Sequence, residues 1–184
     1  MAMALPRPYE KPEDSPDARL VAEAARGSPD ALAALYSRYA RELLALAYRL
    51  LQSRQDAEDV VHDVFVGLPE ALRRYEERGS LGPWLRKITA RVALMRLREQ
   101  RARPVVELDE RRAHASVNTP ETALTIEQAL RALSPNLRAV LVLKEIEGFT
   151  HAEIAAMLDI SVGASEVRLH RALIAMRATL LDNT

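Results

Sequence analysis

Two arginines near the end of the sequence are spaced for contact with a nucleic acid. Arg168 and Arg171 lie three residues apart in the segment ISVGASEVRLHRA, so a helix would bring both guanidinium groups to one side. Guanidinium groups bind phosphate oxygens and the acceptor edge of guanine, and small side chains beside them allow the approach of a thymine methyl group. Ala164 and Val167 share this side and His170 flanks it. The pattern therefore predicts contact with duplex DNA.

A glutamate near the start of the same helix, Glu166, has an open role. A carboxylate beside a phosphate would repel the DNA, whereas at a base edge it can accept a hydrogen bond from cytosine N4. An ion pair with protonated His170, or simple solvation, explains Glu166 equally well. Upstream, Thr150 is a candidate N-cap and His151 opens a helix whose first backbone N–H groups suit a phosphate.

A second group of charged residues lies in the first half, although 26 basic and 26 acidic residues make the formal net charge zero. Basic residues dominate one segment, with Arg86, Lys87, Arg91, Arg96, Arg98, Arg101 and Arg103. Acidic residues dominate an earlier segment, with Asp56, Glu58, Asp59 and Asp63. This segregation favours two different partners over evenly solvated helix faces.

Several classes of protein are disfavoured by what the sequence lacks. The chain has no cysteine, which excludes disulfides, thiolate zinc sites and cysteine nucleophiles. Its four histidines are scattered, and neither a phosphate-binding glycine loop nor a nucleophile elbow occurs. We therefore expect no metal, no cofactor and no catalysis. Because no run of about 18 apolar residues and no signal-peptide core are present, we expect a cytoplasmic protein without direct membrane insertion.

The elements that must position these residues are predicted to be helices. Abundant Leu and Ala, 4% aromatic residues and only 6 glycines favour helices over strands. Apolar residues at three- and four-residue steps, with Ser-Pro starts at Ser28 and Ser134, set the expected bounds. These bounds are residues 16–26, 29–52, 54–75, 83–101, 120–133, 135–147, 150–158 and 162–182. Within the third helix, Pro69 should cause a kink or a break.

The expected fold is all-α, with two small helical domains joined by a flexible linker. We assign residues 1–16 to a disordered tail, 17–103 to the first domain, 104–119 to the linker and 120–184 to the second domain. The last two helices are joined by a short turn and match a helix-turn-helix. Apolar residues on one stripe of the final helix should pack inward, namely Val162, Leu169, Leu173, Met176 and Leu180.

Two long segments resemble known domains. The segment from Ala129 to Ala172, ALRALSPNLRAVLVLKEIEGFTHAEIAAMLDISVGASEVRLHRA, resembles region four of bacterial RNA polymerase sigma factors. The segment that begins DALAALYSRYARELLALAYRL at Asp30 and ends GSLGPWLRKI at Ile88 resembles region two of their extracytoplasmic-function (ECF) group. The resemblance implies an alternative sigma factor, a non-catalytic subunit that binds core RNA polymerase and directs promoter-specific initiation.

The resemblance also implies a role for each candidate residue. The acidic helix would dock on the clamp helices of the largest polymerase subunit through Asp56, Glu58, Asp59, Val60, Asp63, Val64 and Phe65. The loop from Tyr75 to Gly82 and the basic helix after it would open and read the minus-ten element through Tyr75, Trp84, Arg86, Lys87, Arg91, Arg96 and Arg98. For Trp84, a role as a core anchor is the alternative to stacking on a base. The final helices would read the minus-thirty-five element through Thr150, His151, Ala164, Glu166, Val167, Arg168, His170 and Arg171. The implied partners are core RNA polymerase, including its flap, promoter DNA and an anti-sigma factor, with the free chain a monomer.

Two other readings of the sequence stay open. A stand-alone helix-turn-helix regulator would need only the last two helices, but it would not need the acidic helix of the first half. A sigma-like docking protein that has lost DNA recognition would explain Glu166 and the zero net charge. In the final helix, Ser165, Glu166 and Val167 replace a more usual Val, basic residue and Ser of the family, so the promoter sequence does not follow from relatives.

Overall fold

The computed structural model describes residues 17–75, 80–102 and 121–182, and every regular element in these ranges is a helix. The first half contains α1 (Ala18–Ala25), α2 (Pro29–Leu51), α3 (Arg54–Leu72) and α4 (Leu81–Ala102). The second half contains α5 (Glu121–Ala132), α6 (Pro135–Leu141), the π-helical turn η2 (Val142–Ile146), α7 (His151–Leu158) and α8 (Val162–Asp182). The predicted all-α class is confirmed. The predicted tail and linker lie outside the described residues.

Short polar residues begin several helices, as the sequence predicts. The Ser28 side chain accepts a hydrogen bond from the backbone N of Ala31, and Pro29 takes the first helical position of α2. At α7 the Thr150 hydroxyl accepts from the backbone N of Glu153 at 3.2 Å, while the Glu153 carboxylate accepts from the backbone N of Thr150 at 3.1 Å. This reciprocal pair is a capping box, which fixes where the first helix of the helix-turn-helix starts.

The proline inside α3 does not break the helix. The helix continues through Pro69 and ends at Leu72, so the predicted break is absent and the helix stops before the predicted Tyr75. Proline lacks the N–H that would bond the carbonyl four residues earlier, at Phe65. Because Pro69 lies in the last turn, this loss affects only the end of the helix.

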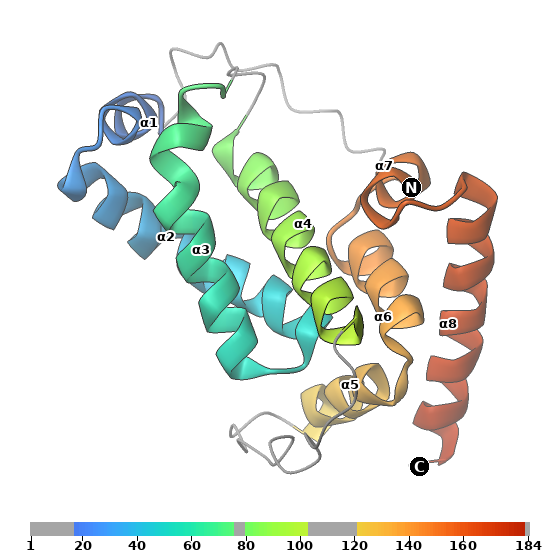
Figure 1. Ribbon diagram of the computed structural model, residues 1–184. Coiled ribbons are helices and arrows are strands. Elements are labelled where there is room, and N and C mark those ends of the chain that lie inside the picture. Colours follow the sequence, from blue (N-terminus) through green and yellow to red (C-terminus); the bar gives the residue numbers. More distant parts are fainter. Residues whose placement is uncertain (1–16, 76–79, 103–120, 183–184) are drawn as a thin grey trace, which may run out of the picture.

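Two clusters of buried side chains hold the helices together. The first lies within the first half and includes Leu35, Leu43, Val64, Leu68 and Leu85. The second joins side chains of α2, α3 and α4 to side chains of α5 through α8, and it includes Leu46, Leu50, Leu143, Ile154 and Ala172. In Figure 1, α6 and α7 lie between α4 and α8. The two helical units are therefore packed against each other in this structure.

The side through which helix α8 packs overlaps the predicted side only in part. Val162 and Leu173, which were expected to face inward, are each 45% exposed, whereas Ser165 and Ala172 are fully buried. Leu169 and Met176 pack against the core, as predicted. Small side chains at a helix contact allow the backbones to approach closely. Close packing through small residues therefore set the rotation of α8 about its axis, and the apolar period was wrong for Val162 and Leu173.

Candidate nucleic-acid interface

The outer side of α8 carries charged groups without intramolecular ion pairs. Its exposed residues include Glu166, Val167, His170 and Arg171, with Ala164 and Arg168 half-buried beside them. Within the described ranges, neither Arg168 nor Arg171 has an ion pair, and the pair between Glu166 and His170 considered above is not formed. The guanidinium groups are thus free to meet phosphates or base edges, and the Glu166 carboxylate is free to meet a base amino group.

A hydrogen bond between α7 and α8 was not anticipated from the sequence. The Ser165 hydroxyl is fully buried on the inward side of α8 and lies 2.9 Å from Nδ1 of His151, the first residue of α7. A buried hydroxyl requires such a partner, because leaving it unpaired costs free energy. The bond uses one ring nitrogen of His151, so only Nε2 is left for contact with DNA. One feature of the sequence could have indicated that Ser165 faces inward. Ser165 lies seven residues before the small residue Ala172, about two helical turns, so both fall on the same side of α8.

We expect the His151–Ser165 pair to be coupled in stability. Exchange of His151 for phenylalanine leaves the Ser165 hydroxyl buried without a partner, which should lower the free energy of unfolding by about 1–3 kcal/mol. Adding Ser165→Ala removes the unpaired hydroxyl and should restore most of that loss. Thermal or urea unfolding followed by circular dichroism measures both variants. An equally unstable double variant would show that the hydrogen bond does not hold α7 to α8.

One side of α4 combines an aromatic ring with three cations. Trp84, Lys87, Arg91 and Arg98 recur at steps of three, four and seven residues, so they fall on one side of the helix. The Tyr75 ring packs on that of Trp84, with 4.7 Å between centroids. Paired rings beside cations suit the bases and phosphates of a single strand. Four of the seven residues predicted for the minus-ten element thus lie along one side of α4, and a fifth, Tyr75, contacts the first of them.

The other two cations predicted for this element are paired within the first half. The Arg86 guanidinium lies 2.7 Å from the Glu42 carboxylate of α2. The Arg96 guanidinium lies 2.9 Å from Asp59 and 3.7 Å from Asp56, both predicted to face the polymerase. The acidic and basic segments, which the sequence suggested were separate, are therefore partly joined through Arg96.

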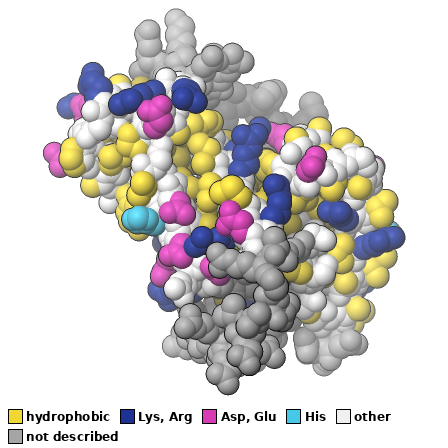
Figure 2. Space-filling view, in the orientation of Figure 1, with side chains coloured by type: hydrophobic (Ala, Val, Ile, Leu, Met, Phe, Trp, Pro, Cys, Tyr) yellow, Lys and Arg dark blue, Asp and Glu magenta, His cyan; other side chains and the backbone are white. Residues whose placement is uncertain are grey.

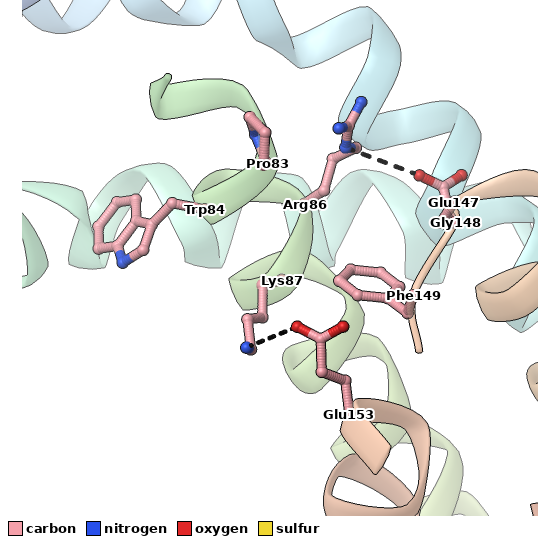
Figure 3. A pocket seen from close by; sticks show the side chains of 8 residues that line it. All are labelled: Pro83, Trp84, Arg86, Lys87, Glu147, Gly148, Phe149 and Glu153. Atoms are coloured by element: carbon pink, nitrogen blue, oxygen red, sulfur yellow. Dashed lines mark hydrogen bonds and ion pairs between the residues drawn. The ribbon is translucent and has the colours of Figure 1, made fainter. Parts of the chain in front are cut away.

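A cleft separates the start of α4 from the turn before α7 (Figure 3). Its lining residues are Pro83, Trp84, Arg86, Lys87, Glu147, Gly148, Phe149 and Glu153. The Lys87 ammonium donates to the Glu153 carboxylate at 3.1 Å, and the guanidinium of Arg86 lies 4.0 Å from Glu147. A backbone hydrogen bond from Thr150, and then the bond from Lys87, lower the pKa of Glu153. The two glutamates in this cleft were not predicted to be site residues.

Glu147 is a buried carboxylate with only long ion pairs. Its side chain is 7% exposed and its nearest cation, Arg49, is 3.5 Å away. Burial raises the pKa of Glu147 above its usual value of 4.5, and the attraction of Arg49 and Arg86 opposes this only in part. The ionised carboxylate therefore costs more in the folded state than in water.

This burial predicts a pH dependence of stability. A carboxyl group whose pKa is raised by folding contributes its full stability below its unfolded pKa and loses it as the pH rises through the folded value. We therefore expect wild-type stability to fall, relative to the Glu147→Gln variant, as the pH rises above about 4.5. Unfolding midpoints of both proteins from pH 4 to 7 measure the difference. A gap between the two proteins that stays constant across this range would contradict the assigned burial cost.

The acidic helix α3 presents only part of its predicted docking set. Val60 and Val64 are 1% and 4% exposed, so they stabilise the core and the prediction that they contact a partner is corrected. The Phe65 ring packs edge-on against Tyr36 of α2 with 4.9 Å between centroids, and Tyr36 and Val66 are 50% and 67% exposed. Figure 2 shows acidic side chains gathered over the lower part of α3. They are Glu58, Asp59 and Asp63, all exposed, and the half-buried Asp56.

The apolar part of this surface was misplaced because periodicity does not say which side of a helix another helix covers. Helix α3 is covered by α2 on the side of Val60 and Val64, so the accessible apolar residues are Tyr36 and Val66, with Phe65 between core and surface. Exposed aromatic and aliphatic side chains rimmed by carboxylates are typical of a protein docking surface.

Two further observations concern the described part of the chain. It contains no group of three His, Asp or Glu side chains arranged to hold a metal ion. None of its helices combines the length and the apolar character that a bilayer crossing requires.

The fold and its exposed arginine-bearing helix define a helix-turn-helix DNA-binding protein with a second helical unit. Residues 35–103 match the family description "Sigma-70 region 2", and residues 123–176 match "Sigma-70, region 4". RNA polymerase sigma factor CarQ of Myxococcus xanthus is 30% identical over 155 residues, which cover 79% of this chain and 86% of CarQ. ECF RNA polymerase sigma factor SigM of Mycobacterium tuberculosis is 29% identical over 157 residues, which cover 85% of this chain and 80% of SigM.

A solved structure agrees with these relatives. CnrH, determined in complex with the cytosolic domain of CnrY, superposes with a TM-score of 0.58 at 28% identity, over 91% of this chain and 99% of CnrH. The chain belongs to the ECF group of the sigma-70 family of RNA polymerase sigma factors.

Proposed function

We propose that this chain is an alternative sigma factor that binds core RNA polymerase and directs transcription from specific promoters, with residues 17–103 and 120–184 as its two working domains. The observation that carries the proposal is the pairing of a free cationic recognition helix, α8, with a second unit that has an acidic docking surface. A stand-alone regulator does not require the unit that carries the acidic docking surface. Initiation at a promoter requires both the recognition helix and the docking unit, because the protein must bind the polymerase while it recognises the DNA.

Helix α8 is proposed to enter the major groove of the minus-thirty-five element. Arg168 and Arg171 would contact phosphates or guanine edges, Val167 and Ala164 would allow close approach, and the free carboxylate of Glu166 would accept from cytosine. His170 completes the outer side of the helix. Thr150 uses its side chain in the capping box, so its contribution to DNA is proposed to come through the start of α7, together with Nε2 of His151.

The side of α4 that bears Trp84, Lys87, Arg91 and Arg98 is proposed to hold the opened strand of the minus-ten element. Tyr75 and Trp84 would stack bases and the cations would follow the phosphates. We propose a smaller role for Arg86 and Arg96, because carboxylates of the first half already pair with them.

The surface formed by Tyr36, Phe65 and Val66, with Asp59 and Asp63 beside it, is proposed to dock on the clamp helices of the polymerase. Apolar side chains would supply most of the affinity and carboxylates would orient a basic partner. The solved relative CnrH is in complex with the cytosolic domain of CnrY, and we propose that this chain likewise binds a second protein, which for this chain would be an anti-sigma factor. We place its action in the cytoplasm, where the polymerase works, and as a monomer.

Run-off transcription tests the proposal. The full-length chain is added to purified core RNA polymerase with fragments of genomic DNA from the native host as template. We expect discrete transcripts that core polymerase alone does not make. Binding to core polymerase without such transcripts would favour a docking protein without DNA recognition, and DNA binding without core binding would favour a stand-alone regulator. Either result would overturn the proposal.

A further inference from the structure

Asp17, the residue before α1, has a buried carboxylate that does not cap its own helix. An aspartate at this position usually accepts a hydrogen bond from the first turn, but that bond is not formed here. Asp17 is 5% exposed, and both Arg38 and Tyr39 of α2 donate to its carboxylate. A buried carboxylate is unfavourable unless it is paired in this way. The Asp17 side chain therefore holds two neighbouring side chains of α2 and not the start of α1.

Tyr39 connects this carboxylate to the start of α4. Burial, and then the bond to Asp17, raise the pKa of the Tyr39 phenol, so the hydroxyl stays protonated and acts as the donor. The ring packs against the buried cluster that contains Leu81 and Leu85 of α4. A Cβ atom on Gly82 would lie 3.4 Å from Cε1 of this ring. The Tyr39 ring therefore covers the residue in the first turn of α4 that has no side chain of its own.

The first turn of α4 sets the position of Trp84. Gly82 precedes Trp84 by two residues, so their Cα atoms are at most about 7 Å apart. The Trp84 ring in turn packs on that of Tyr75 with 4.7 Å between centroids, and this pair is proposed to stack bases of the opened strand. Glycine permits more backbone conformations than other residues, so a contact from outside the turn is needed to hold one of them. The Tyr39 ring supplies that contact.

We infer that Tyr39 is a positioning residue for the minus-ten strand, because its ring, oriented by the carboxylate of Asp17, fixes the first turn of α4 and with it the ring of Trp84. This inference rests on the proposed function and adds to it a residue that acts through Trp84 and not by contact with the DNA. Arg38 donates to the same carboxylate, and its side chain is 46% exposed. Arg38 is therefore the matched control, since its loss disturbs Asp17 but leaves the Tyr39 ring against Gly82.

Intrinsic fluorescence tests this positioning in the free full-length chain, because Trp84 is its only tryptophan. Tyr39→Leu keeps an apolar side chain but removes the ring and its hydroxyl. We expect the emission maximum of this variant to shift to longer wavelength and quenching by acrylamide to increase, since a less firmly held Trp84 ring meets more water. Tyr39→Phe keeps the ring and should show a smaller change. Arg38→Ala should show none.

A second control separates positioning from stability. Val64→Ala truncates a side chain of the same buried cluster on α3. It should lower the unfolding midpoint but leave the Trp84 emission of the folded protein unchanged, because the Tyr39 ring is still present. Equal emission changes in Val64→Ala and Tyr39→Leu, or none in Tyr39→Leu, would overturn the inference.

Binding of the opened strand tests the consequence for function. Holoenzyme reconstituted with each variant is titrated with a fluorescent oligodeoxynucleotide that carries the minus-ten sequence of a promoter found by the run-off experiment. We expect Tyr39→Leu to bind it about tenfold more weakly, or about 1.4 kcal/mol, which lies within the range for one base stacked on an aromatic ring. Its affinities for core polymerase and for the minus-thirty-five duplex should be unchanged. Arg38→Ala should bind the strand as wild type does.

The two experiments separate the inference from the proposed function. Equal losses of strand affinity in Tyr39→Leu and Arg38→Ala, or no loss in Tyr39→Leu, would contradict the positioning role and leave the proposed function intact. A wild-type holoenzyme that binds no strand would count against the proposed function. In that case the fluorescence of the free chain would still decide whether Tyr39 positions Trp84.

Discussion

Replacement of Tyr36 by alanine should weaken binding to core RNA polymerase by about 30-fold, which corresponds to the loss of roughly 2 kcal/mol at an interface hot spot. Tyr36 is half exposed and its ring meets Phe65 edge to face, so it is an accessible aromatic ring of the apolar surface on α2 and α3. Aromatic rings at such positions contribute most of the binding energy of protein interfaces, because they bury a large area with little loss of conformational freedom. Fluorescence anisotropy of the labelled full-length chain, titrated with core polymerase, measures the change.

The conservative variant Tyr36→Phe serves as its control. This variant retains the ring and its contact with Phe65, and it should keep core affinity within about threefold of wild type, since it removes only an exposed hydroxyl. A comparison with Val64→Ala separates binding from folding, because Val64 is buried and its truncation should lower the unfolding midpoint. If Tyr36→Ala bound core polymerase as tightly as Tyr36→Phe, the docking surface would have to lie elsewhere on the first half.

Replacement of Arg171 by alanine should weaken binding of the minus-thirty-five duplex by about tenfold, because a guanidinium contact to a base edge or phosphate is worth about 1–3 kcal/mol. Arg171 is exposed on the outer side of α8 and has no intramolecular ion pair among the described residues. No internal contact is therefore lost, and stability should be unchanged. The assay is binding of the reconstituted holoenzyme to a labelled promoter duplex, with core affinity measured separately.

Arg177→Ala is the matched control for Arg171. It removes the same charge from an exposed position six residues further along α8, beyond the part of the helix that is proposed to enter the groove. We expect this variant to bind duplex within about twofold of wild type, as for a general loss of one positive charge. Equal losses in both variants would indicate non-specific attraction, and a parallel loss of core affinity in Arg171→Ala would mean that its role is misassigned.

The cation-bearing helices show how far sequence patterns reach at a binding site. The predicted minus-ten set contained seven residues, and helical spacing alone places Trp84, Lys87, Arg91 and Arg98 on one side of α4. Spacing does not show which groups from elsewhere in the chain contact that side of α4. The partners Glu153 and Met157 lie 66 and 59 residues away from Lys87 and Arg98 along the chain, and only packing of the two halves brings them together.

The recognition helix gives a second instance of the same limit. Its existence, its start after the turn at Asp159 and its cations follow from local signals. Its rotation does not, because apolar residues alone suggested that Val162 and Leu173 pack inward, whereas Ser165 and Ala172 do so. The burial of Ser165 is explained by its hydrogen bond to His151 of the neighbouring helix, which only the structure shows.

The sequence by itself determined the helical class, where most of the helices begin, the caps at Ser28 and Thr150, and the family, because these depend on spacing, propensity and turn chemistry within a few neighbouring residues. Only the tertiary structure decided which side of each helix is covered and which charges are paired. Val60 and Val64 are buried in the core, Arg96 forms an ion pair with Asp59 of the acidic helix, and Lys87 donates to the carboxylate of Glu153. The physical reason is that burial and ion pairing depend on residues distant in the chain, and their positions are set by how whole helices pack.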